Sequence, residues 1–156
     1  MKRVCPECQG EGYRVYPGET TAVAEACSCV TEQCPHCGGK GYVHWENEAG
    51  YSYVKPCSCQ QLGQRANLFN QAQVPARFAD ATLDSYVPES EKQMNLLLRI
   101  RQMQSEYQIG DQGLLLIGPP GVGKTHLACA FIRTVSMEKG IQCRFLEFFL
   151  LVSQIR

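Results

Sequence analysis

The sequence contains no apolar run near the length that crosses a membrane. A membrane-spanning helix needs about 20 consecutive apolar residues, and the first residues, Met1 to Pro6, also lack the apolar stretch of a secretory signal. The 156 residues include 15 basic and 15 acidic side chains, so no excess of either sign predicts a general binder of polyanions. We therefore expect a cytoplasmic protein with no membrane partner.

Cysteine, in contrast, is abundant and unevenly distributed. Eight of the ten cysteines lie within residues 5–59, and the other two are Cys129 and Cys143. In a reducing cytosol, a dense cysteine cluster more often binds metal than forms disulfides. The two later cysteines lie in apolar stretches, and we expect both to be inert core thiols. The chain thus divides into a cysteine-rich head and a different tail.

The head contains one cysteine motif twice. Cys-Pro-Glu-Cys-Gln-Gly-Glu-Gly-Tyr begins at residue 5, and Cys-Pro-His-Cys-Gly-Gly-Lys-Gly-Tyr begins at residue 34. Each copy is followed by Cys-Ser-Cys, at 27–29 and at 57–59. Two cysteines separated by two residues can direct both sulfurs to one ion, and zinc takes four such ligands in a tetrahedron. The residues in between, such as Val15 and Tyr53, predict short hairpins that bring each Cys-Ser-Cys back.

Eight thiolates can form two closed zinc sites, and we expect two structural Zn²⁺ ions. A head of this size buries too little core to fold without them. Spacing also permits an interlaced pairing, in which the two outer motifs share one ion and the two inner motifs share the other. Iron–sulfur ligation is a further alternative. The sequential pairing that we favour consists of Cys5, Cys8, Cys27 and Cys29 for the first ion and Cys34, Cys37, Cys57 and Cys59 for the second.

The repeated motif resembles the cysteine-rich region of DnaJ-type chaperones. Those proteins carry four such units, whereas this chain has two and lacks the His-Pro-Asp tripeptide of a J domain. Trp45, Tyr51 and Tyr53 could stack on bases, but the charge of residues 1–60 favours a protein partner over nucleic acid. This segment has the five basic residues Lys2, Arg3, Arg14, Lys40 and Lys55 and the seven acidic residues Glu7, Glu11, Glu19, Glu25, Glu32, Glu46 and Glu48.

Residues 61–88 connect the head to the tail. They are rich in glutamine and asparagine at first, which predicts a linker with one short helix that ends by Pro75. Ser90 can cap a longer helix with apolar residues at helical spacing, which Gly110 would end. We therefore divide the chain into a zinc-binding domain at 1–60, a linker and lead-in segment at 61–88, and a nucleotide-binding part at 89–156.

Residues 118–125 read Gly-Pro-Pro-Gly-Val-Gly-Lys-Thr, which is the Walker A pattern of a phosphate-binding loop. The preceding apolar run, 114–117, predicts a strand buried on both faces, and 124–137 predicts a helix. In such a loop the glycines let backbone N–H groups face the phosphates, and the helix N-terminus adds its positive dipole. The ATP site that we predict consists of Gly118, Pro119, Pro120, Gly121, Val122, Gly123, Lys124, Thr125 and His126.

Two residues of this set have specific expected roles. Lys124 should reach the β- and γ-phosphates, and the Thr125 hydroxyl should bind Mg²⁺. A second strand at 142–148 and a helix from Phe149 onward should follow. The predicted fold class is an α/β P-loop NTPase, preceded by a small β-hairpin zinc-binding domain.

Three further stretches accompany the Walker A loop in a characteristic order. They are Val-Pro-Ala-Arg-Phe at 74–78, Thr-Leu-Asp-Ser-Tyr at 82–86, and Gly-Lys-Thr-His-Leu-Ala at 123–128. From about residue 74 to the end, the chain resembles the DnaC/DnaI/IstB group of AAA+ ATPases, which are replicative-helicase loaders and transposition helpers.

This resemblance implies ATP-dependent assembly, as a homo-oligomer, on a helicase and on single-stranded DNA during DNA replication. In loaders of the DnaI type an N-terminal zinc-binding domain contacts the helicase. The head would by analogy contact a protein partner, either a replicative helicase or a transposase.

The same resemblance implies catalytic machinery that this sequence lacks. Hydrolysis in the family needs an Asp-Glu pair after the third strand, sensor residues and an arginine finger. No aspartate follows Asp111, and neither Glu138 nor Glu147 follows a suitable apolar run. The strands that separate the first two strands of an AAA+ sheet are also missing, so residues 114–117 would lack hydrogen-bonding neighbours.

We therefore expect no catalytic residue here and an incomplete AAA+ core, made of strand, loop, helix and strand, that is part of a longer ATPase. The alternative is a zinc-dependent interaction module, chaperone-like or a transposition helper, with a non-catalytic nucleotide site.

Overall fold

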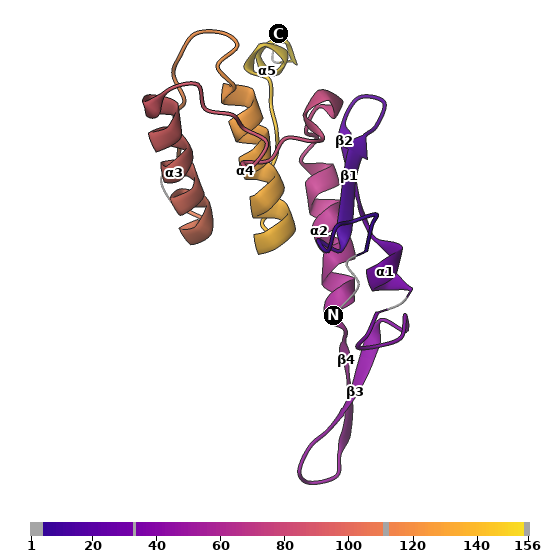
Figure 1. The fold of residues 1–156 in the computed structure, drawn as a ribbon. Coiled ribbons are helices and arrows are strands. Elements are labelled where there is room, and N and C mark those ends of the chain that lie inside the picture. Colours follow the sequence, from indigo (N-terminus) through magenta and orange to yellow (C-terminus); the bar gives the residue numbers. More distant parts are fainter. Residues whose placement is uncertain (1–4, 33, 111–112, 155–156) are drawn as a thin grey trace.

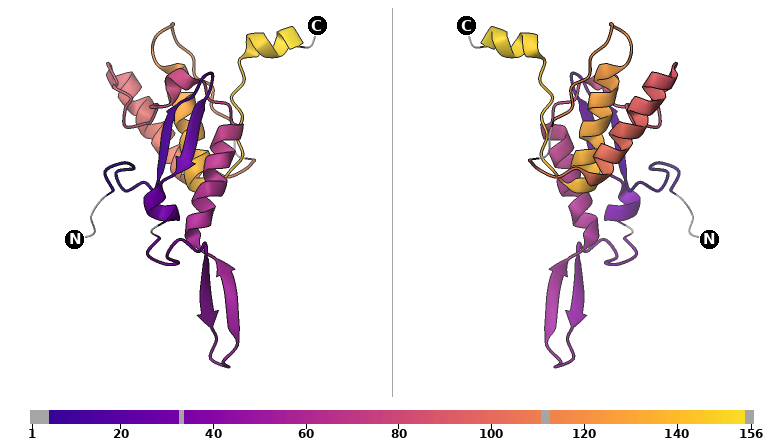
Figure 2. Two further views of the ribbon diagram at one scale, coloured as in Figure 1. Left: turned by 90° about the vertical axis from the view of Figure 1, so that its right-hand side faces the viewer. Right: turned by 90° about the vertical axis from the view of Figure 1, so that its left-hand side faces the viewer.

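The computed structural model describes residues 5–32, 34–110 and 113–154 (Figure 1). Two β-hairpins lie at one side of a layer of three long helices, α2, α4 and α3, and the second hairpin projects away from the rest (Figures 1 and 2). No helix in the described ranges has both the length and the apolar character to span a membrane. The elements in chain order are β1 (Tyr13–Pro17), β2 (Ala22–Ala26), α1 (Ser28–Thr31), β3 (Tyr42–Glu46), β4 (Ser52–Pro56), α2 (Ser58–Gln71), the 3₁₀ turn η1 (Ala76–Phe78), α3 (Glu91–Glu106), α4 (Lys124–Lys139) and α5 (Phe148–Gln154).

The two hairpins confirm the prediction that each cysteine motif folds back on its Cys-Ser-Cys. β1 pairs antiparallel with β2, and β3 pairs antiparallel with β4. Gly12 and Gly41 precede the first strand of each hairpin with φ of 80° and 77°, a conformation that glycine adopts without steric cost. Their carbonyl oxygens accept hydrogen bonds of 2.8 Å from the N–H groups of Cys27 and Cys57. The two copies therefore fold by the same local rule.

Helix α2 joins the head to the rest of the molecule. It begins in the second Cys-Ser-Cys, with Cys57 as its N-cap, and it buries Ala66 and Phe69. The side-chain amide of Asn70 accepts a bond from the backbone N–H of Ala24 and donates one to its carbonyl, at 2.7 and 3.0 Å. The short helix that we expected before Pro75 is thus a 14-residue element that packs on β2 and α4.

The larger hydrophobic core contains residues from all three predicted segments, 1–60, 61–88 and 89–156. β2 supplies two alanines, α2 supplies Ala66 and Phe69, and α4 supplies the thiol of Cys129. The boundaries at 60 and 88 stay predictions, but the described segments share this one hydrophobic cluster. Its buried members are Ala22, Ala24, Ala66, Phe69, Ala72, Val74, Ala79, Ala81, Cys129 and Met137.

A second core lies between α3 and α4. The expected cap of α3 is confirmed, because the Ser90 hydroxyl accepts a bond of 3.3 Å from the N–H of Gln93. The helix ends at Glu106, four residues before Gly110. The buried residues of this core are Leu83, Tyr86, Leu97, Ile100, Leu127 and Ala130, so α3 supports the helix that follows the phosphate-binding loop.

The two predicted tail strands are wrong for the described residues. Residues 114–117 and 142–147 have no regular secondary structure, and the two hairpins are the sheets found in the described ranges. Leu115 and Ile117 are 81% and 86% exposed rather than buried. An apolar run predicts burial, but a strand forms only where a neighbour pairs with its backbone groups. The two helices that we expected before and after residues 142–147 are confirmed as α4 and α5.

Candidate nucleotide-binding loop and metal centres

The eight head cysteines form two compact clusters. In each, four sulfur atoms lie within 4.8 Å of one another. The cross-hairpin Sγ–Sγ distances are 3.8 and 3.5 Å in the first cluster and 3.7 and 3.6 Å in the second. Four sulfurs at 2.3 Å from a tetrahedral zinc ion lie about 3.8 Å apart. The clusters are Cys5, Cys8, Cys27 and Cys29, and Cys34, Cys37, Cys57 and Cys59, which is the sequential pairing and not the interlaced one.

Each cluster has one thiol with an unusually low pKa. Burial opposes the charged form of Cys8, but the backbone N–H groups of Gly12 and Gly10 lower its pKa to about 7. The backbone N–H of His36 is the main cause that lowers the pKa of Cys34 to about 6. Each cluster therefore has one sulfur on which negative charge is stabilised before any cation binds.

One further sulfur in each cluster resists ionisation. Burial and the neighbouring sulfurs raise the pKa of Cys59 to about 12, and the same causes raise the pKa of Cys29 far above its ordinary value. Four thiolates this close can coexist only around a cation, and a divalent, thiolate-preferring ion supplies that charge. The all-sulfur donor set and the spacing both fit Zn²⁺ in a closed site, whose role is to hold the hairpin ends together.

The Walker A residues form a loop at the start of α4. Gly118 to Gly123 make the loop and Lys124 begins the helix, with Gly123 as its N-cap. The Lys124 ammonium donates to the carbonyl oxygens of Gly118 and Pro119, at 2.9 and 2.8 Å. The lysine is thus folded back over the loop, next to the helix N-terminus that favours anions.

Tyr86 fixes the shape of this loop, although the sequence analysis gave it no such role. Its hydroxyl donates to the carbonyl oxygen of Val122 at 3.1 Å. A Cβ atom at Gly123 would lie 2.6 Å from the Tyr86 ring, and Gly123 has a φ of 87°. The signal was present in the Thr-Leu-Asp-Ser-Tyr stretch, but only the packing shows which residue the tyrosine contacts.

His126 faces the same stretch. Its Nε2 lies 2.9 Å from the carbonyl oxygen of Thr82 and 3.3 Å from the Ser85 hydroxyl, and its ring lies 5.9 Å from that of Tyr86. An ion pair of 2.6 Å between Asp84 and Arg101 attaches this segment to α3. The contacts of His126 therefore hold the 82–86 segment against α4, whereas its contact with nucleotide stays a prediction.

Thr125 lies beside Lys124 on the rim of an open cavity of about 550 Å³. Side chains from four places in the chain line it, including the two tail segments without regular secondary structure. The lining residues are Arg77, Leu114, Leu116, Lys124, Thr125, Ala128, Phe145, Leu146 and Glu147. The hydroxyl that should bind Mg²⁺ and the lysine that should bind phosphate thus share one accessible space.

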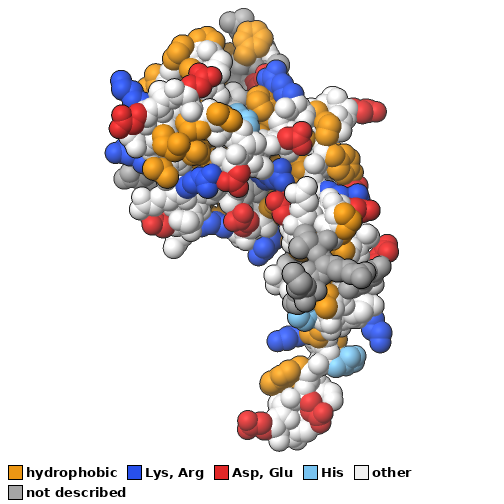
Figure 3. All heavy atoms as spheres, viewed as in Figure 1, with side chains coloured by type: hydrophobic (Ala, Val, Ile, Leu, Met, Phe, Trp, Pro, Cys, Tyr) orange, Lys and Arg blue, Asp and Glu red, His pale blue; other side chains and the backbone are white. Residues whose placement is uncertain are grey.

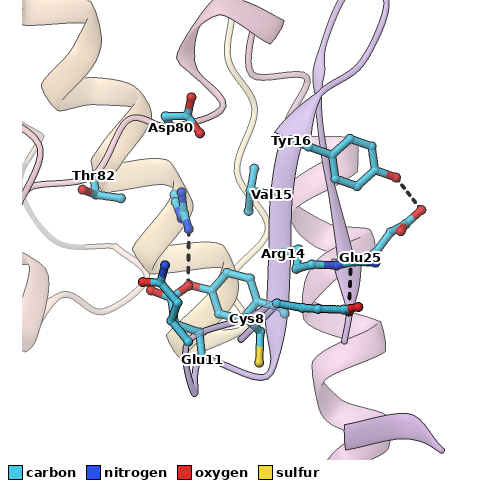
Figure 4. A pocket seen from close by; sticks show the side chains of 12 residues that line it. Cys8, Glu11, Arg14, Val15, Tyr16, Glu25, Asp80 and Thr82 are labelled. Carbon is cyan, nitrogen blue, oxygen red and sulfur yellow. Dashed lines mark hydrogen bonds and ion pairs between the residues drawn. The ribbon is translucent and has the colours of Figure 1, made fainter. Parts of the chain in front are cut away.

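A second cavity, of about 650 Å³, lies between the first hairpin and α4 (Figure 4). Arg133 from α4 reaches into it and bonds the Glu11 carboxylate at 3.4 Å and the carbonyl oxygen of Ala79 at 3.2 Å. The guanidinium also lies 5.7 Å from the centre of the Tyr13 ring. Because Glu11 follows Cys8 closely in the chain, this contact joins the first cysteine cluster to the helix of the phosphate-binding loop.

A family model described as IstB-like ATP binding protein matches residues 64–156, which is more than half of the chain. The chain belongs to this family. No curated protein and no solved structure matches it.

The IstB-like match begins inside α2 and includes the whole phosphate-binding loop, so ATP binding is supported for this region. It extends the resemblance, which we placed from about residue 74, by ten residues toward the N-terminus. The eight clustered cysteines lie outside the matched range. The IstB-like region therefore includes the tail, and the cysteine-rich head lies outside it.

Proposed function

We propose that this protein binds ATP and Mg²⁺ at residues 118–126 and uses the bound nucleotide to assemble, as a helicase loader does, on a replicative helicase and single-stranded DNA. The observation that supports the proposal is the shaped Walker A loop, held by Tyr86 at Gly123, in a chain of the IstB-like family.

The proposed roles follow from the positions of the side chains. Lys124 exchanges its two loop carbonyls for the β- and γ-phosphates, and Thr125 binds Mg²⁺ from the first turn of α4. Gly121 and Gly123 let the loop N–H groups turn toward the phosphates. Pro119, Pro120 and Val122 shape the loop, and His126 orients the neighbouring segment. Two Zn²⁺ ions stabilise the head, which contacts the protein partner.

Titration with a fluorescent ATP analogue tests the nucleotide site. The Lys124→Ala variant should bind at least about 10-fold more weakly, because a charge-assisted hydrogen bond to phosphate contributes roughly 1.5–3 kcal/mol. Lys92→Ala is the matched control, since Lys92 is an exposed lysine on α3 and its loss should leave affinity unchanged. Equal affinity for the Lys124→Ala variant and the wild type would overturn the proposed site.

The IstB-like description of the family model favours a second candidate, a transposition helper with a transposase as its partner. Gene order separates the two: a transposase gene beside this one supports the helper, and a replication operon supports the loader.

A zinc-dependent interaction module is the remaining alternative, and the two closed cysteine clusters favour it. In that case binding to the protein partner survives Lys124→Ala and is lost when the clustered cysteines are replaced. In the ATP-dependent case both changes weaken binding to the partner.

A further inference from the structure

The hairpin β3–β4 exposes aromatic side chains that nothing in the described structure covers. It projects beyond the body of the molecule (Figures 1 and 2). Acidic side chains lie at its tip, and hydrophobic side chains lie closer to the body (Figure 3). Trp45, Tyr53 and Tyr51 are 55%, 49% and 66% exposed. Exposed clusters of large rings mark interaction surfaces, and a two-stranded hairpin has no core that would otherwise use them.

The strand register sorts the hairpin side chains onto two faces. Trp45 pairs with Tyr53 and Val43 pairs with Lys55, so these four side chains share one face. Tyr51, two residues from Tyr53, continues it toward the tip. We call these five residues the Trp45 face. The opposite face has Tyr42, His44, Glu46, Ser52, Val54 and Pro56.

Charge differs between the two faces. The Trp45 face has one cation, Lys55, and no acidic residue, because the register places Glu46 on the opposite face. Glu48 lies in the turn at the tip. The excess of acidic residues in the head, which by itself favours a protein partner, is therefore not carried by the Trp45 face.

The rings have a spacing suited to planar ligands. Trp45 and Tyr53 have ring centres 5.9 Å apart and planes inclined by 37°, so neither ring covers the face of the other. Tyr51 directly precedes β4, and its carbonyl oxygen accepts a hydrogen bond of 3.1 Å from the N–H of Asn47, which continues the pairing of the two chain segments. Residues two positions apart in such an extended segment are separated by about 6.8 Å. That is about twice the 3.4 Å separation of stacked bases, so one base has room between the two rings.

We propose that the Trp45 face is a stacking platform for the unpaired bases of a single-stranded nucleic acid. Stacking rather than phosphate contact supplies the affinity, because Lys55 and Lys40 are the two lysines or arginines in residues 38–56 and the second cysteine cluster adds negative charge at the hairpin base. The inference rests on the proposed assembly on single-stranded DNA, and it places that polymer contact on the head rather than on the nucleotide-binding tail.

Trp45 is the one tryptophan of the chain, so its fluorescence reports directly on this face. Titration of the zinc-loaded protein with a 12-nucleotide oligo(dT) should quench the emission, and the blunt duplex of oligo(dT) with oligo(dA) should not, because its bases are already stacked and paired. The measurement contains no ATP, so a failure of ATP binding at Lys124 does not affect its outcome.

Variants measured by the anisotropy of labelled oligo(dT) locate the contact. Removal of one stacking ring should weaken binding by about 5- to 100-fold in Trp45→Ala and in Tyr51→Ala. Tyr51 lies outside β4, so the second variant keeps the hairpin. Tyr42→Ala is the matched control: Tyr42 is half-exposed on the opposite face, and its loss should change affinity by less than about 2-fold, since it makes no stacking contact.

Salt dependence is the remaining readout. With two cations available, log affinity should fall against log salt with a slope no steeper than about −1.4, and Lys55→Ala should reduce that slope by about 0.7. An unquenched Trp45, or an equal loss in the Tyr42→Ala and Tyr51→Ala variants, would overturn the proposal and leave the Trp45 face to a protein partner.

Discussion

At the scale of single residues, the contact between Gly123 and Tyr86 explains the shape of the phosphate-binding loop. The sequence alone predicts the Walker A glycines, because the loop needs left-handed backbone angles that glycine adopts without steric cost. The tyrosine is different, because its role depends on how residues 82–86 pack across α4. The structure adds the reason why this glycine tolerates no side chain: a Cβ atom would lie 2.6 Å from the ring.

Two glycine substitutions should therefore have opposite effects. Gly123→Ala adds the left-handed strain of about 1–2 kcal/mol to a clash with Tyr86, so it should lower the free energy of unfolding and weaken binding of the ATP analogue. Gly63→Ala lies within α2, where no atom approaches a Cβ within 4 Å, and should raise stability by roughly 0.5–1 kcal/mol. Urea unfolding of the zinc-loaded proteins measures both. Equal effects would contradict this account of the loop.

At the scale of secondary-structure elements, the sequence predicts correctly those elements that depend on nearby residues. It fails for strands that depend on partners far away in the chain. The hairpins, α3 and α4 follow from turn glycines, a serine cap and helical periodicity, all of which act over a few residues. The strands predicted at 114–117 and 142–148 needed backbone partners from elsewhere in a sheet, which the local sequence does not encode. The length of α2 was underestimated because its composition, rich in glutamine and asparagine, resembles a linker, although Ala66 and Phe69 face the core.

Substitution of Phe69 tests how much α2 contributes to the stability of the protein. It is 1% exposed in the cluster that joins β2, α2 and α4, and Phe69→Ala should destabilise the protein by about 3–5 kcal/mol. Asn67→Ala on the same helix is the control, since Asn67 is exposed and alanine favours helix. Thermal unfolding should show the head and the α4 region losing structure together in the Phe69→Ala variant. Separate transitions would mean that 61–88 acts as a linker after all.

At the scale of the whole molecule, the cysteine clusters tie the head to the nucleotide-binding loop. The second cluster includes the N-cap and first turn of α2, and α2 packs on α4. The first cluster is joined to α4 through Glu11 and Arg133. Metal bound by the head therefore stabilises, through these two connections, the helix that starts at Lys124.

Acidification should release this metal and loosen both regions. Bound zinc requires thiolates, so its release takes up protons and becomes more favourable as pH falls. Two of the cluster thiols, Cys8 and Cys34, have lowered pKa values of about 7 and about 6. Below those values protons compete with the metal even for these two sulfurs. A chromophoric chelator should detect two zinc ions per chain at pH 7.5 and progressive loss as the pH falls below about 6.

The Cys143→Ser variant should show the same zinc profile, because Cys143 lies outside both clusters. Cys59→Ser should lose one ion and, by removing the anchor at the start of α2, lower the unfolding temperature of the whole protein by more than the Cys143→Ser change does. A metal content of one or zero at pH 7.5 would contradict the two-site assignment. Full zinc retention at pH 4 would contradict the proton competition, since the thiolate of Cys34 would then persist well below its pKa of about 6.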